Sequence, residues 1–177
     1  MLSENLRGKN IILASGSPRR QELFKELGLE FTIKVKSIEE KYSSTLKEEK
    51  ITNYLSVLKA EAFEGELVKN DIVITADTIV WHNNKPLEKP KNKQEAIEML
   101  QTLSGTSHKV ITSICIKTIS KQEVFSDTTI VHFKGLTVED ILFYVENYNP
   151  YDKAGGYGIQ EWIGFIGVTK LEGSYFN

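Results

Sequence analysis

Residues 71–80 read Asp71-Ile72-Val73-Ile74-Thr75-Ala76-Asp77-Thr78-Ile79-Val80, a strongly strand-like stretch. Such a run of β-branched apolar residues is typical of a buried strand, and Asp77-Thr78 interrupts it. An ionised carboxylate among apolar neighbours is costly unless it is paired or bound to a metal. The alternative is a strand-end turn in which Asp77 caps local N–H groups. The apolar flanks favour a site, because strand-end carboxylates commonly bind Mg²⁺ together with substrate phosphates.

Helical and strand-like patterns alternate on both sides of this stretch. Further strands are predicted over residues 10–13, 31–35, 109–119 and 124–133, with a last one near 165–168. Helices are predicted over residues 19–27 after Ser17-Pro18, from Ile51 to Ala62, up to Leu103 after an Asn92/Glu95 capping box, and up to Val145 after Thr137. Residues 37–50 are polar, and residues 82–85 are typical of a hairpin tip. This order predicts an α/β fold with a mixed β-sheet flanked by helices.

Length and charge limit the function classes. The chain has 177 residues, with 22 Lys and Arg against 24 Asp and Glu, which gives a formal net charge of −2. The length suits a single domain over residues 1–177, or one domain with two lobes around a cleft. The weakly acidic balance argues against polymeric nucleic acid as a partner, because phosphate backbones need clustered excess cation. It leaves room for a small anionic ligand in a local basic pocket.

The compartment is predicted from three signals. The N-terminus lacks the pattern of a signal peptide, and no apolar run is long enough to span a membrane. The lone Cys115 fits a reducing compartment and lies in a strand pattern typical of a core. The three histidines show no metal-ligand spacing. We therefore expect a cytoplasmic protein with no membrane partner.

A first candidate ligand site is Ser15-Gly16-Ser17-Pro18-Arg19-Arg20, between a predicted strand and a predicted helix. A helix N-terminus presents unpaired N–H groups and a partial positive charge. The two hydroxyls and two guanidiniums beside it suit a phosphate. The alternative is a plain helix start with solvated arginines, and the segment alone does not decide between the two.

Other candidates are weaker by themselves. Glu40, in a polar loop, could complete a metal site with Asp77, although such acids are usually solvated. Lys59 lies in a predicted helix and Lys89 precedes Pro90, but composition alone does not select either lysine. The glycine-rich segment 152–160 ends at Gln160, whose amide suits a base edge, and the alternative is a plain turn.

Taken in chain order, these segments resemble the motifs of the Maf nucleoside triphosphate pyrophosphatases. The opening motif corresponds to residues 12–20 and the central motif to residues 76–80 with 87–90. The later motifs correspond to residues 103–105 with His108 and Val110, and to Asp152-Lys153-Ala154-Gly155-Gly156-Tyr157-Gly158-Ile159-Gln160. Several matches in family order, from about Ile11 to the end of the chain, are far more specific than any one of them.

The resemblance implies a two-lobed α/β fold with a deep central cleft, a divalent cation (Mg²⁺ or Mn²⁺), and hydrolysis of a nucleoside triphosphate to the monophosphate and pyrophosphate. It implies Asp77 as the catalytic residue and Glu40 with Asp77 as metal ligands. The implied substrate-binding residues are Ser15, Arg19, Arg20, Lys59 and Lys89. Arg19, Thr78 and Gln160 match the residues that mark the branch acting on dTTP and UTP. A homodimer is left open.

Two departures from the family pattern are present. Glu161-Trp162-Ile163 follows Gln160 where many members have small residues, which would reshape the base pocket. The chain stops at Asn177, where most relatives continue through a further segment and a final helix, so a C-terminal family segment is expected to be absent.

The mechanism expected from the resemblance divides the work among these residues. The cations neutralise the triphosphate, Asp77 accepts the proton of the attacking water, and Thr78 with Gln160 reads a pyrimidine edge, including edges of modified pyrimidines. The alternatives are a pyrophosphatase for another nucleotide such as 7-methyl-GTP, a nucleotide-binding regulator of septum formation without turnover, and a structural scaffold.

Overall fold

The computed structural model describes residues 2–177, which form a mixed seven-stranded sheet with helices. The strands are β1 (Asn10–Leu13), β2 (Thr32–Ile33), β3 (Asp71–His82), β4 (Lys85–Leu87), β5 (Ser107–Lys117), β6 (Gln122–Phe133) and β7 (Val168–Glu172). The helices are α1 (Leu2–Asn5), α2 (Pro18–Glu26), α3 (Glu49–Glu61), α4 (Lys93–Leu103), α5 (Val138–Tyr148) and α6 (Trp162–Gly167), with short 3₁₀ turns η1 (Pro150–Asp152) and η2 (Ala154–Gly156). The predicted α/β class is confirmed.

The strand order is β2-β1-β3-β5-β6-β7, with β4 paired to β3. The chain divides into two compact units. Three long strands, β3, β5 and β6, each contribute residues to both units. We call the residues up to Asp77 together with Ser113–Ser126 the N-terminal unit, and Thr78–Thr112 together with Asp127–Asn177 the C-terminal unit. The single domain over residues 1–177 and the deep cleft stay predictions.

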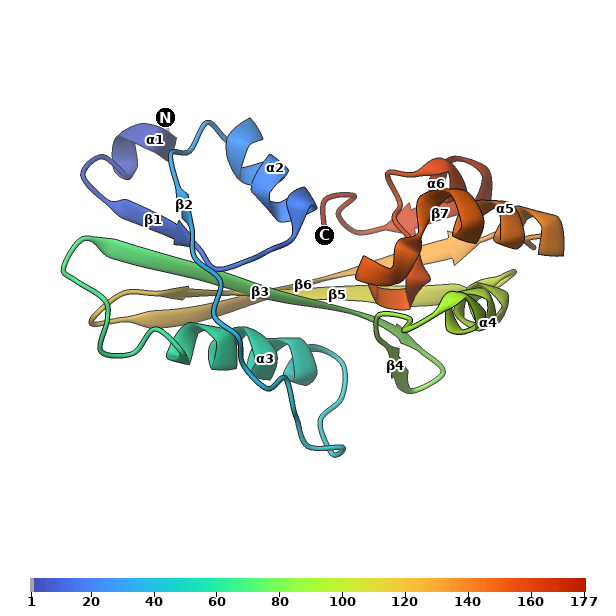
Figure 1. Ribbon diagram of the computed structural model, residues 1–177, viewed down its shortest axis with the longest axis horizontal. Coiled ribbons are helices and arrows are strands. Elements are labelled where there is room, and N and C mark those ends of the chain that lie inside the picture. Colours follow the sequence, from blue (N-terminus) through green and yellow to red (C-terminus); the bar gives the residue numbers. More distant parts are fainter. Residues whose placement is uncertain (1) are drawn as a thin grey trace. The chain divides into compact units, whose positions relative to one another are not determined.

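The N-terminal unit is built on parallel strand pairing. β1 pairs with β3 from Asn10↔Asp71 to Leu13↔Ile74, and with β2 at Leu13↔Ile33. Parallel neighbours need crossover connections, and α2 and α3 lie within these two connections. Figure 1 shows the two helices on opposite sides of β3. This arrangement brings the start of α2 and the middle of α3 to the same strand.

Helix α2 begins and ends as its sequence predicts but buries less. Pro18 occupies its first turn, and Gly28 follows it with a φ of 65°, in the left-handed region that favours glycine. None of its residues is buried, and Leu27 is 56% exposed. The predicted half-buried strand over residues 31–35 is wrong in extent, because β2 has two residues and both are exposed.

Helix α3 is held to the sheet by buried hydroxyls as well as by apolar side chains. The Thr75 hydroxyl on β3 donates to the Ser56 carbonyl at 2.6 Å, and the hydroxyls of Thr52 and Ser113 are 2.6 Å apart. Ile51 and Leu55 are buried on the same helix, whereas Tyr54, predicted on the apolar face, is 44% exposed. The face that packs on the sheet is therefore a mixed apolar and hydroxyl face.

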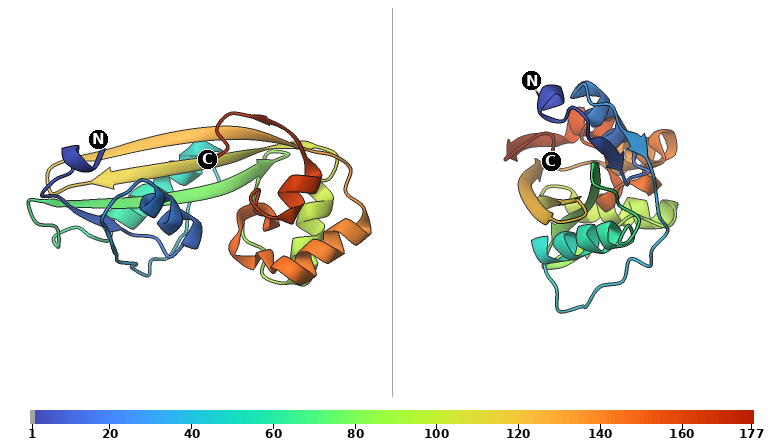
Figure 2. Two further views of the ribbon diagram at one scale, coloured as in Figure 1. Left: turned by 90° about the horizontal axis from the view of Figure 1, so that it is seen from above. Right: turned by 90° about the vertical axis from the view of Figure 1, so that its left-hand side faces the viewer.

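The C-terminal unit has the larger apolar core, and Figure 2 shows α4, α5 and α6 grouped together there. The β3–β4 hairpin turns at two asparagines with positive φ, as predicted for residues 82–85. Asn92 caps α4 by accepting from the Glu95 N–H, and Thr137 opens α5 with a full capping box. The N-terminal limits of both helices are thus confirmed.

One predicted element of this unit is wrong. A strand was expected over residues 165–168, but residues 162–167 form α6 and the strand β7 begins at Val168. A short apolar run fits either a buried strand or a helix segment, so its periodicity could not separate the two. The Gly164 N–H donates to the Glu161 carbonyl, which closes the first turn of the helix.

Candidate functional site

Asp77 lies in the middle of β3 and not at a strand end, so the predicted interruption of the strand is wrong, and so is the strand-end placing. Side chains alternate along a strand, and Thr75 and Asp77 therefore share one face. Thr75 bonds α3 from that face, which directs Asp77 at the same helix. Asp77 is 7% exposed. A strand interior rather than a turn therefore positions this carboxylate.

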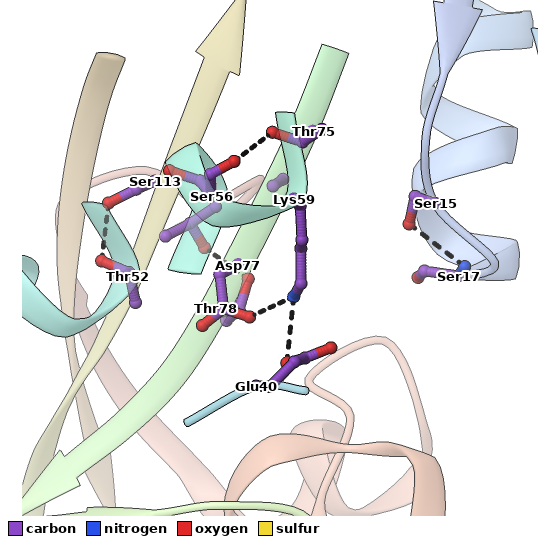
Figure 3. Close-up of polar contacts among 12 residues, drawn as sticks. Ser15, Ser17, Glu40, Thr52, Ser56, Lys59, Thr75, Asp77, Thr78 and Ser113 are labelled. Carbon is purple, nitrogen blue, oxygen red and sulfur yellow. Dashed lines mark hydrogen bonds and ion pairs between the residues drawn. The ribbon is translucent and has the colours of Figure 1, made fainter. Parts of the chain in front are cut away.

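Lys59 is the partner that α3 supplies. It lies three residues after Ser56, so both residues are on the same side of the helix. The Lys59 ammonium donates to Asp77 Oδ1 at 2.6 Å and is 3.2 Å from Glu40 Oε2 (Figure 3). Ser56 and Lys59, about one turn apart on α3, thus contact Thr75 and Asp77, two residues apart on β3. The loop before α3 supplies the second carboxylate, that of Glu40.

The surroundings of Asp77 act on its pKa in opposite directions. Burial raises the pKa of its carboxyl above the ordinary value, and the nearby charge of Glu40 adds to this. Lys59 and Arg20 act against the shift by favouring the ionised form. No described residue donates a hydrogen bond to the buried Oδ2 of Asp77. An acceptor oxygen inside the protein is therefore left for another group.

The segment 15–20 is partly organised by its own contacts. The Ser17 N–H donates to Ser15 Oγ at 3.2 Å, and the Ser17 hydroxyl, predicted as the cap, makes no capping bond to α2. Arg20 donates to the Ala76 carbonyl at 2.9 Å and to Ser15 Oγ at 3.4 Å. Burial lowers the pKa of Arg20, and Asp77 acts in the opposite direction. Arg20 is therefore tied to β3 beside Asp77, whereas Arg19 is exposed.

The carboxylates of Glu40 and Asp77 suit a divalent cation that takes its remaining ligands from substrate and water. Within residues 2–177, no three His, Cys, Asp or Glu side chains gather to hold a metal. Glu40 and Asp77 share Lys59, and Asp77 Oδ2 is an unpartnered hard oxygen. Mg²⁺ is usually held by one or two carboxylates, substrate phosphates and waters, so these residues fit such an ion.

The structure brings together five of the predicted site residues, all in the N-terminal unit: Ser15, Arg20, Glu40, Lys59 and Asp77. Thr78 follows Asp77 on β3 and points to the other face, where its hydroxyl lies 2.9 Å from that of Thr112. Lys89 and Gln160 belong to the C-terminal unit and are exposed, so their membership of one site stays a prediction.

Sequence reasoning missed the hydroxyls that fix α3 on the sheet. Thr52, Ser56, Thr75 and Ser113 are all fully buried. The available signal was Thr52 and Ser56 at helical spacing beside Ile51 and Leu55, which marks polar residues on a core-facing side. These residues carry no charge, so they do not stand out in the sequence as candidates for a catalytic or binding site.

The fold and site define an α/β protein in which two cations, Lys59 and Arg20, lie beside the buried carboxylate of Asp77. The N-terminus of α2, next to Arg20, suits a phosphate. The family model described as "Maf-like protein" matches residues 10–177, and the chain therefore belongs to the Maf family. The predicted resemblance is confirmed.

Curated relatives cover the whole chain. A dTTP/UTP pyrophosphatase of Flavobacterium johnsoniae is 58% identical over 177 residues, covering 100% of this chain and 91% of that protein. The protein of the same name from Flavobacterium psychrophilum is 52% identical with the same coverage. One from Bacteroides fragilis is 48% identical over 174 residues, covering 98% of this chain and 90% of that protein. No described helix of this chain combines the length and apolarity that crossing a membrane requires.

Proposed function

We propose that the protein hydrolyses dTTP and UTP to the nucleoside monophosphate and pyrophosphate, with the help of a divalent cation. The observation that carries this proposal is Asp77, buried in β3, held through Oδ1 by Lys59 and left with an unpartnered Oδ2. Relatives at 48–58% identity over nearly the whole chain carry the name dTTP/UTP pyrophosphatase, which supports this substrate class.

The chain's own residues divide the chemistry. Lys59 and Arg20 stand beside Asp77, and Arg19 and Lys89 add charge to neutralise the triphosphate. Asp77 Oδ2 accepts the proton of a water that attacks in line with the departing pyrophosphate. A bound Mg²⁺ or Mn²⁺, held by Glu40 and Asp77, supplies charge stabilisation for the phosphates. Positioning and charge carry the reaction, and no covalent intermediate is needed.

The base is read by Arg19, Thr78 and Gln160. The amide of Gln160 offers one acceptor and two donors, which suits the alternating carbonyl and N–H groups of a uracil or thymine edge. Modified pyrimidines that keep this edge are expected substrates as well. The same proposal places the enzyme in the cytoplasm, and its lone, buried Cys115 agrees with a reducing compartment. The homodimer stays a prediction.

The decisive experiment measures pyrophosphate released from a panel of nucleoside triphosphates, with Mg²⁺ or Mn²⁺ and with a chelator. The expected result is metal-dependent release that is fastest with dTTP and UTP. Faster release from 7-methyl-GTP or another nucleotide would overturn the substrate class. Nucleotide binding without product would indicate a regulator, and a melting temperature that no nucleotide shifts would indicate a scaffold.

A further inference from the structure

A buried lysine lies in the C-terminal unit, in a cluster that the proposed chemistry does not use. Lys153 is 8% exposed and forms ion pairs with Glu161 Oε1 at 3.1 Å and with Asp152 Oδ1 at 2.8 Å. The other oxygen of Glu161 accepts a hydrogen bond from the Tyr144 hydroxyl. Tyr144 itself is fully buried. Both oxygens of the Glu161 carboxylate are therefore occupied.

This cluster holds the two ends of one turn. The Glu161 N–H donates to the Gly158 carbonyl at 3.0 Å, which closes a β-turn over residues 158–161. The Gly158 N–H donates to the Tyr144 hydroxyl at 3.0 Å, so a single phenol contacts the first and last residues of the turn. Gln160, the third residue, is exposed at the tip. The anchored ends thus hold Gln160 in place at the exposed tip of the turn.

Close packing limits the same turn from two sides. A Cβ added at Gly158 would lie 3.1 Å from Glu161 Cδ and 3.1 Å from Lys153 Cε. A Cβ added at Gly164, in α6, would overlap the carbonyl of Ile159. These glycines let the backbone of α6 and the anchoring side chains approach the turn closely. The turn has little room to shift.

We propose that Glu161 and Tyr144 are positioning residues that fix the Gln160 turn and thereby set the discrimination between nucleobases. The proposal rests on the proposed function, in which the Gln160 amide reads a pyrimidine edge. An amide discriminates by matching donors and acceptors at hydrogen-bond distance, so a displaced turn loses the match with one base more than the general affinity. Cytosine, with an amino group and an unprotonated ring nitrogen on this edge, is the natural competitor.

The test is Tyr144→Phe, which removes the hydroxyl and keeps the ring. We expect the ratio of kcat/KM for dTTP to that for dCTP to fall by roughly tenfold, mainly through a higher KM for dTTP. The kcat for dTTP stays within about twofold, because the Asp77 site is untouched. Tyr148→Phe is the matched control, since its ring stacks on Tyr144 from the next turn of α5 and is 37% exposed. This control should keep the wild-type ratio.

A second variant and a double variant complete the experiment. Glu161→Gln keeps the shape and one acceptor oxygen but removes the charge that pairs with Lys153, and it should lower the same ratio even if Tyr144→Phe folds poorly. In a Gln160→Ala background, Tyr144→Phe should no longer change the ratio, because its effect passes through Gln160. An unchanged ratio in both single variants would overturn the proposal, including the case in which kcat/KM falls equally for dTTP and dCTP.

Failure of the proposed function would look different. If the wild type released no pyrophosphate from dTTP, the substrate assignment would fall, and the dissociation constants of dTTP and dCTP would replace kcat/KM. A dTTP preference in binding that Tyr144→Phe reduces would then support the positioning role. Equal binding changes for both nucleotides would overturn it.

Discussion

Each of the two units places a lysine between two carboxylates, and the two clusters differ in whether every carboxylate oxygen has a partner. In the C-terminal unit, Lys153 and the Tyr144 hydroxyl occupy both oxygens of Glu161. In the N-terminal unit, Lys59 takes Oδ1 of Asp77, and no described residue donates to Oδ2. The first cluster is closed within the protein and the second is open.

Whether every buried oxygen has a partner distinguishes a structural cluster from a reactive one better than the charges do, because both clusters contain a lysine and two carboxylates. A buried acceptor without a partner costs free energy, so proteins seldom keep one that no ligand or water uses. A satisfied network, by contrast, fixes the local geometry. The glycine-containing segments of the two units repeat the contrast. Gly16 has no described atom near an added Cβ, whereas Gly155 packs against Val80.

The largest effect is expected from Asp77→Asn, which replaces the open carboxylate with an amide. If Oδ2 accepts the proton of the attacking water, kcat for dTTP should fall by roughly 10³-fold. The matched control is Asp71→Asn, the same change at a more accessible position of the same strand, where the carboxylate accepts hydrogen bonds from the Asn10 amide and the Val68 N–H. Pyrophosphate release is the measurement. Near-normal turnover by Asp77→Asn, with metal present, would remove Asp77 from the mechanism.

The glycine contrast predicts the next largest effect, on stability. Gly155 has a φ of 69°, and an added Cβ would lie 2.7 Å from Val80 Cγ2. Gly155→Ala should therefore lower the free energy of unfolding by about 3 kcal/mol, through backbone strain and overpacking. Gly16→Ala, with an ordinary φ and open space, should leave it within about 0.5 kcal/mol. Urea denaturation measures both, and equal losses would contradict the contrast.

The sequence predicted the open site better than the closed one. Asp77 stands out because a charge in an apolar run needs a partner, and Arg20 lies in a segment that suits a phosphate, whereas Lys59 is selected only by the resemblance to the family motifs. Their convergence follows from parallel pairing of β1 and β3, which alternating strand and helix patterns predict. The closed cluster was not predicted, because Tyr144, Lys153 and Glu161 come from α5, a 3₁₀ region and a turn. No periodic pattern relates such segments.

A third contrast applies one substitution to the lysine of each cluster, Lys59 and Lys153. Lys153→Met leaves the partly buried Glu161 with Tyr144 as its anchor, so the free energy of unfolding should fall by about 1–3 kcal/mol. Lys59→Met removes the group that most opposes the rise in the pKa of Asp77. The pKa therefore rises further, and the acid limb of the pH–kcat profile should move to higher pH.

The two readouts keep these variants apart. Lys153→Met should leave the position of the acid limb unchanged, because Lys153 belongs to the closed cluster. The limb is read from its position on the pH axis, so the lower overall rate expected of Lys59→Met does not disturb the measurement. A limb that stays in place in Lys59→Met would mean that Lys59 does not control the ionisation of Asp77.

The smallest effect is the pH dependence of stability that the open carboxylate produces. Burial raises the pKa of Asp77 above its ordinary value of 3.8, so the folded state holds this proton more tightly than the unfolded state does. Stability from this group is fully present below the ordinary pKa and is lost as pH rises through the folded pKa. The difference in unfolding free energy between wild type and Asp77→Asn should therefore decrease as pH rises above about 4.

Asp71 provides the opposite sign on the same strand. Hydrogen bonds from Asn10 and from the Val68 N–H lower the pKa of its carboxyl below 3.8. Stability from Asp71 is therefore present above the ordinary pKa and is lost as pH falls through the folded pKa. The difference between wild type and Asp71→Asn should accordingly increase with pH over the acid range. Urea denaturation of the three proteins across that range measures both slopes. Slopes of the same sign would mean that Lys59 and Arg20 outweigh burial at Asp77, so that its pKa is lowered in the folded state as that of Asp71 is.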